Sequence, residues 1–159
     1  MGKYLNSRVP FETWKQITRT RFFVDKTRLL EDVLKAVEID GQKFLCITRP
    51  RRFGKSVMAN MIGAFLGKVS DSGRTFHNLA IEDNEHCKKH LNQHNVIFID
   101  FSRAPRDCSS YVQYINRIQD GINQDLAETY PEIRIDVTDA VWDNLLAIFE
   151  KTHEAFVFV

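Results

Sequence analysis

Apolar residues recur at intervals of three and four in four parts of the chain, the spacing that places side chains on one face of a helix. The apolar positions are Leu30, Val33, Leu34 and Val37; Met58, Met61, Ile62, Phe65 and Leu66; Tyr111, Ile115, Ile118, Ile122 and Leu126; and Val141, Leu145, Ile148 and Phe149. The expected caps are Asp25 or Thr27, Ser109 or Ser110, and Thr138, and the expected stops are Gly41 and Gly67. The sequence therefore predicts four helices, the second of which runs from Lys55 to Leu66.

Three short, unbroken apolar runs accompany these helices. They are Phe44 to Ile47, Val96 to Ile99 and Phe156 to Val159. Such runs are typical of strands that are buried on both faces of a parallel sheet. Because strands alternate with helices, we predict an α/β fold in which the three strands pair in parallel and helices cover both faces. The polar stretch from Phe76 to His94 predicts no definite element.

The composition fits one domain over residues 1–159. The chain has 43% hydrophobic and 27% charged residues and a formal net charge of +1, so it has no overall attraction for nucleic acid. No apolar run approaches the roughly 20 residues that cross a bilayer, and Met1 to Pro10 does not resemble a secretory signal. The three cysteines, Cys46, Cys87 and Cys108, are widely spaced and odd in number. We therefore expect a cytoplasmic protein with free thiols.

The junction between the first predicted strand and the helix from Lys55 carries the strongest candidate chemistry. A phosphate-binding loop needs converging backbone N–H groups, a lysine for the β- and γ-phosphates, and a serine or threonine for Mg²⁺. Gly54, Lys55 and Ser56 meet these needs in order, although Arg49 replaces the usual first glycine and Pro50 has no N–H. A solvated basic turn is the alternative. The candidate nucleotide-binding residues are Arg49, Pro50, Arg51, Arg52, Phe53, Gly54, Lys55 and Ser56.

Two segments of the chain are similar to one known family. Arg49 to Ser56 (Arg-Pro-Arg-Arg-Phe-Gly-Lys-Ser) and Phe22 to Thr27 (Phe-Phe-Val-Asp-Lys-Thr) resemble motifs of the AAA-ATPase-like domain family of bacterial and archaeal proteins. In that family the Arg-Pro-Arg-Arg form is the normal phosphate loop. The resemblance implies a P-loop NTPase-type sheet of the additional-strand class and an ATP hydrolase that uses ATP and Mg²⁺. It also implies, in longer proteins, a linked PD-(D/E)XK nuclease-like domain with nucleic acid as a partner.

The resemblance places the acids needed for hydrolysis after the third core strand, which here is Phe156 to Val159. The sequence ends there, so we expect a truncated domain that binds ATP but hydrolyses it poorly or not at all. Its open sheet edge should favour self-association. Asp100, directly after the second predicted strand, is a further candidate for Mg²⁺; its structural alternative is a strand-end aspartate that bonds to its own loop.

Two further groups of residues have both a functional and a structural interpretation. The resemblance implies a place beside the nucleotide for Asp25 and Lys26, but Asp25 could equally cap a helix. The second group is His86, Cys87, His90 and His94. Its histidines would share a helical face, a spacing that can hold Zn²⁺, yet the polar residues around them indicate an ordinary surface. We expect no structural metal.

The leading interpretation is thus a domain that binds Mg-ATP, with Arg51 or Arg52 adding positive charge. The alternative is a non-hydrolysing module whose loop contacts phosphate or nucleic acid. No aromatic platform alternates with the arginines in the sequence, so base stacking has no support at this level.

Overall fold

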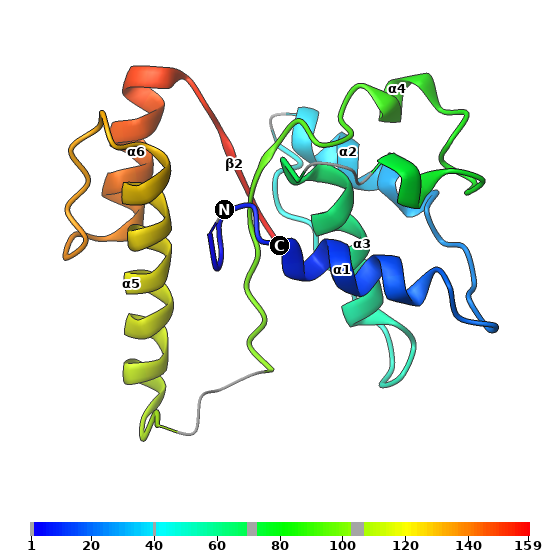
Figure 1. Cartoon of the computed structure of the whole chain (residues 1–159), viewed down its shortest axis with the longest axis horizontal. Helices are drawn as coiled ribbons and strands as arrows, with labels where there is room; N and C mark the ends of the chain where they lie inside the picture. The colour runs from blue at the N-terminus through cyan, green and yellow to red at the C-terminus, as the bar shows by residue number, and fades with distance from the viewer. Residues whose placement is uncertain (1, 40, 70–72, 103–106) are drawn as a thin grey trace.

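Helices surround a small central sheet (Figure 1). The computed structural model describes residues 2–39, 41–69, 73–102 and 107–159. Its helices are α1 (Arg8–Ile17), α2 (Leu29–Glu38), α3 (Lys55–Leu66), α4 (Glu85–Lys88), α5 (Tyr111–Thr129) and α6 (Val141–Thr152), with a 3₁₀ turn, η1, at Gly73–Phe76; its strands are β1 (Asn95–Ile97) and β2 (Phe156–Phe158). The four predicted helices are therefore confirmed as α2, α3, α5 and α6. No helix within the described residues combines the length and the apolar character that crossing a bilayer requires.

The two strands pair in parallel, as predicted for these two runs. The pairing continues past the strand ends, because Val159 N–H donates to Ile97 O at 3.0 Å and Ile99 N–H donates to Val159 O at 2.9 Å. The other edge of β1 is met by the N-terminal residues through an antiparallel bridge between Leu5 and Ile97. β1 thus has a backbone partner along each of its two edges.

The first predicted strand, Phe44 to Ile47, does not form, and this prediction is wrong. Among the described residues the sheet has two strands, and this segment lies beside them without pairing. Phe44 is fully exposed and Leu45 is half-exposed. An apolar run becomes a strand only when a neighbour accepts and donates its backbone hydrogen bonds. Here a groove lies between the segment and β2, so the two backbones do not meet.

Helices cover both faces of the sheet, as predicted. α5 and α6 lie on one face, and α1, α2 and α3 lie on the other (Figure 1). The layer of α5 and α6 packs on Ile97 and Phe156, whereas the layer of α1, α2 and α3 packs on Val96 and Val157. Successive strand residues point to opposite faces, so neighbouring residues of one strand serve separate cores.

The helix α1, which was not predicted, packs against α3. Ser7 caps it by accepting a hydrogen bond from Val9 N–H at 3.4 Å, and Trp14 is buried in the core. The two helices lie close because Gly63 has no side chain: a Cβ there would be 2.9 Å from Cβ of Pro10. This packing holds the N-terminal part of the chain beside α3.

The predicted helix caps are only partly correct. Ser110 caps α5 as predicted. α2 and α6 follow Arg28 and Ala140, and neither helix has a side-chain cap. Asp25 or Thr27, and Thr138, were the expected caps. The Thr27 hydroxyl instead donates to Asp25, whose carboxylate also accepts from Ala80 N–H, and the Thr138 hydroxyl donates to Asp136, so these side chains are engaged in the preceding turns and do not cap the helices.

Candidate functional site

The residues from Arg49 to Gly54 form a turn that leads directly into α3. Gly54, the last residue before the helix, has a left-handed backbone with φ 81° and ψ 23°. Arg52 is also left-handed, with φ 68°. Glycine adopts this conformation freely, whereas other residues pay about 1–2 kcal/mol. Non-glycine residues with a left-handed backbone cluster at functional sites, so Arg52 marks this loop as a candidate site.

The ammonium group of Lys55 lies over this turn. Its Nζ donates to Arg49 O at 2.6 Å and to Pro50 O at 3.3 Å. Both acceptors are exposed, neutral carbonyl groups, so an anion would compete well with them for the ammonium. The lysine is therefore held where it can exchange carbonyl oxygens for the oxygens of an anionic ligand.

The N-terminus of α3 provides backbone donors at the same place. The first helical bond runs from Met58 N–H to Gly54 O at 2.9 Å, so the N–H groups of Lys55, Ser56 and Val57 have no partner within the helix. No side chain in the described part of the chain caps α3. These N–H groups and the helix dipole together favour an anion. The hydroxyl of Ser56 is exposed in this first turn.

The second motif singled out in the sequence lies beside the loop. A cavity of about 300 Å³ has Phe22 and Lys26 on one wall and Arg52, Phe53 and Gly54 on the other. Phe22 is 85% exposed and Phe53 is 58% exposed, so both rings are accessible to a ligand. Two segments that are far apart in the sequence thus form one site. Phe22 belongs to the second motif but was not a predicted site residue, because only the fold places it on the same cavity as the loop.

Asp25 anchors the first wall of this cavity to the rest of the protein. Its Oδ1 accepts hydrogen bonds from the N–H and the hydroxyl of Thr27 at 2.8 and 2.7 Å, and its Oδ2 accepts from Ala80 N–H at 2.6 Å. Partial burial raises the pKa of Asp25, but the bonds from Ala80 and Thr27 outweigh it, so the pKa lies below its ordinary value of 3.8. Both carboxylate oxygens are engaged within the protein, and Lys26 is the member of this pair that lines the cavity.

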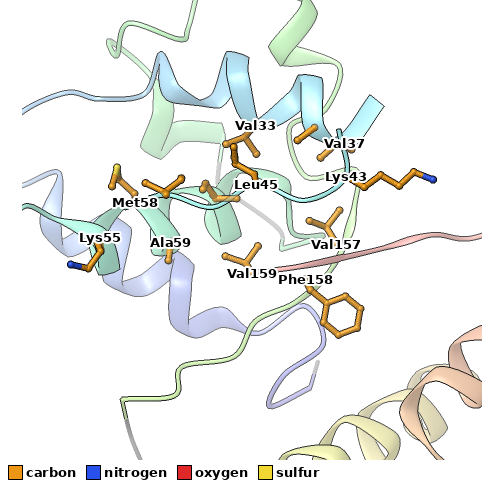
Figure 2. A pocket seen from close by; sticks show the side chains of 13 residues that line it. Val33, Val37, Lys43, Leu45, Lys55, Met58, Ala59, Val157, Phe158 and Val159 are labelled. Atoms are coloured by element: carbon orange, nitrogen blue, oxygen red, sulfur yellow. The ribbon is translucent and has the colours of Figure 1, made fainter. Parts of the chain in front are cut away.

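A second groove, of about 340 Å³, also reaches Lys55 (Figure 2). It lies between the extended segment from Lys43 to Ile47, the helices α2 and α3, and β2. Lys55 and Lys43 lie toward its two ends, and the side chains between them are apolar (Figure 2). Because polar groups converge at the loop and not in this groove, we place the candidate site at the loop and the cavity beside it.

Asp100 lines neither of the two spaces near Lys55. It lines a cavity with Tyr114 and Arg117 of α5, and this cavity shares no residue with the two spaces near Lys55. Its Oδ1 accepts from the N–H of Ser102 at 2.9 Å and from the Ser102 hydroxyl at 2.6 Å. These bonds agree with the loop-bonding interpretation of Asp100, and none of the three cavities is lined by both Asp100 and a residue of the 49–56 loop.

The fold and the site together describe an α/β protein whose candidate anion site is the N-terminus of α3. Comparison with protein families agrees with the motifs on which this site rests. Residues 9–159 match the AAA-ATPase-like family, which is described as a predicted AAA-ATPase. The chain belongs to this family. No curated protein and no solved structure matches it.

Proposed function

We propose that the chain binds ATP with Mg²⁺ through residues 49–56, in an arrangement of the P-loop NTPase type. The observation that carries this proposal is the position of Lys55, whose Nζ lies 2.6 Å from Arg49 O beside an uncapped helix N-terminus. The ammonium and the N–H groups of the first helical turn would hold the phosphate oxygens. Membership of a predicted AAA-ATPase family supports nucleotide use.

The residues present fit both the metal ion and the nucleoside. Ser56 offers an exposed hydroxyl oxygen, the kind of ligand that Mg²⁺ prefers, and Arg51 and Arg52 are exposed and add positive charge. When bound, Mg²⁺ would neutralise charge on the β- and γ-phosphates. The nucleoside would occupy the cavity of about 300 Å³ between Phe22 and Phe53, whose accessible rings offer stacking faces.

The same geometry supports binding without efficient hydrolysis. No carboxylate within the described residues lines the cavity at the loop or the groove at Lys55. Attack of water on a phosphoryl group needs a side chain that orients the water, and Asp100 lines a different cavity. Phosphate release from Mg-ATP should therefore stay near background and should not change in Asp100→Ala. Robust turnover that is lost in Asp100→Ala would contradict this.

Calorimetric titration with Mg-ATP tests the binding site. Lys55→Ala should weaken binding by about 10- to 150-fold, because a charge-assisted hydrogen bond contributes about 1.5–3 kcal/mol. Lys151→Ala is the matched control, since Lys151 is an exposed lysine of α6, across the sheet from α3. Equal affinities for wild type and Lys55→Ala would overturn the assignment of the loop.

One observation favours a second function, contact with single-stranded nucleic acid. The exposed rings of Phe22 and Phe53 lie on the same cavity as Arg52, and basic residues beside accessible aromatic rings suit stacked bases and their phosphates. The rings come from separate segments, so no alternation is visible in the sequence. Binding of single-stranded DNA that weakens steeply with salt, and that Mg-ATP does not displace, would favour this function over nucleotide binding.

A further inference from the structure

A second cluster of ligating side chains lies where α2 meets α4. Glu38 is the last residue of α2, His86 belongs to α4, and His90 lies in the turn that follows α4. Nε2 of His86 lies 3.1 Å from Glu38 Oε2, and Nε2 of His90 lies 2.9 Å from Glu38 Oε1. One ligand atom from each residue can be chosen so that all three lie within 4.8 Å of one another.

We propose that Glu38, His86 and His90 form a binding site for a divalent transition-metal ion, with Zn²⁺ as the best match. Two imidazoles and one carboxylate suit Zn²⁺, whereas Mg²⁺ prefers oxygen ligands alone. Zinc bonds of about 2.0–2.2 Å in a tetrahedron separate ligand atoms by roughly 3.3–3.5 Å. The two imidazole–carboxylate spacings run to different oxygens of Glu38 and are slightly shorter than this, and no spacing among the three ligand atoms exceeds 4.8 Å, so side-chain adjustments of about 1 Å would form the site. The side chains of His86 and Glu38 are 54% and 35% exposed, which leaves room for a water as fourth ligand.

Ordinary ion pairing does not explain the cluster as well. Exposed pairs between a carboxylate and an imidazole contribute little to stability. A divalent cation would instead use a lone pair from each of the three residues at once.

The surrounding protein holds the cluster in place. Cys87 lies between the two histidines in the sequence and is completely buried in the core shared by α2 and α3. Asn84 accepts a hydrogen bond from Cys87 N–H at 3.0 Å and donates to Glu31 Oε1 of α2 at 3.2 Å. A helix as short as α4 is not stable alone. These contacts fix it against α2 before any metal binds, as a binding site requires.

His90 also has the second neighbour that metal-binding imidazoles usually have. Its Nδ1 lies 3.0 Å from Nε2 of His94, and the two rings are stacked with centroids 5.2 Å apart. Donation from Nδ1–H to His94 selects the tautomer whose Nε2 binds the metal. Metal binding needs both Nε2 atoms unprotonated, so it replaces the hydrogen bonds between these atoms and Glu38, and any proton held there is released to solvent.

Titration of Zn²⁺ into the chelator-treated chain tests this site. Cys46 is exposed and Cys108 is partly exposed, so the titrations use the Cys46→Ser, Cys108→Ser background, which removes thiols that bind zinc themselves. We expect one Zn²⁺ per chain and a higher midpoint of thermal unfolding with zinc. Glu38→Gln and His90→Ala should each weaken binding by at least about tenfold, since even neighbours of metal ligands have effects of that size.

The chain provides a matched control for non-specific binding. His77 lies 2.7 Å from Glu82 in an exposed pair of the same chemistry that has one imidazole instead of two, so His77→Ala should leave zinc binding unchanged. Co²⁺ in place of Zn²⁺ should give the visible absorption of a tetrahedral site, and Glu38→Gln should abolish it while circular dichroism shows an unchanged fold. Absence of zinc binding, or equal zinc affinity in the parent and Glu38→Gln, would overturn the proposal.

Discussion

Asp25→Asn is the substitution that best separates the structural contacts of the cavity wall from a direct role in nucleotide binding. The Asp25 carboxylate accepts two hydrogen bonds from Thr27 and one from Ala80. Asparagine keeps one carbonyl oxygen for Thr27 but places its NH₂ group against Ala80 N–H, where two donors meet. The substitution therefore removes one bond and one charge and leaves the turn at Thr27 intact.

The expected effect on stability is modest. A hydrogen bond to a charged acceptor contributes about 1.5–3 kcal/mol, but the bond from Ala80 is exposed, and solvent screening reduces its contribution to about 1 kcal/mol. Asp25→Asn should lower the free energy of unfolding by that amount. Folding lowers the pKa of Asp25, so the unfolded chain binds this proton more readily. The stabilisation is complete above the unfolded-state pKa and is lost as the pH falls through the folded-state pKa.

Urea unfolding followed by tryptophan fluorescence measures both effects, because Trp14 is buried and contacts Phe23 on the same wall. The difference between wild type and Asp25→Asn should be about 1 kcal/mol at neutral pH and should shrink as the solution is acidified. A difference that stays constant with pH would refute the attribution to the carboxylate. The Mg-ATP affinity of Asp25→Asn should change little; a loss as large as that in Lys55→Ala would show that Asp25 acts on the nucleotide directly.

Two further substitutions test the loop and the junction between the sheet and its helices. Gly54→Ala places a side chain at φ 81°, so it should lower the free energy of unfolding by about 1–2 kcal/mol. It should also weaken Mg-ATP binding in calorimetry, and an unchanged affinity would show that binding does not need the left-handed turn. Glu154 accepts hydrogen bonds from the Tyr130 hydroxyl and from Asn95, and these bonds, with the charge of Lys68, hold its pKa below the ordinary value. The thermal midpoint of wild type should therefore fall on acidification more than that of Glu154→Gln, and parallel pH profiles would contradict this linkage.

Local signals explain which elements could be predicted. The apolar face of α3 is complete within its own residues, and Gly54 and Gly67 flank it, so the predicted bounds and the observed ones agree. α1 has a comparable signal that was missed, since Ser7 caps it and Phe11, Trp14 and Ile17 recur at helical spacing, but its packing depends on a partner: Gly63 of α3 leaves space for Pro10. No pattern within α1 reveals that space.

The failure of the predicted strand at Phe44 to Ile47 has the same origin. Apolar character is a property of the segment, but a strand also requires a neighbouring backbone at hydrogen-bonding distance. β1 and β2 form their backbone hydrogen bonds with each other, and the groove in Figure 2 separates the segment from β2. The segment therefore has the composition of a buried strand but lacks a neighbouring strand with which to pair.

The residues of one proposed site are adjacent in the sequence, whereas those of the other are far apart. The two sites should therefore respond differently to changes in the core. The donors of the phosphate loop lie on adjacent residues, so their geometry follows from Gly54 and the first turn of α3. The metal cluster instead joins Glu38 to a histidine 48 residues away, and its geometry depends on the packing of α4 against α2. That separation explains why the polar residues around the histidines indicated an ordinary surface although the histidine spacing can hold Zn²⁺: the carboxylate that completes the cluster is supplied only by the fold. Changes that loosen Cys87 from the core should therefore disturb the metal cluster first and leave the phosphate loop intact.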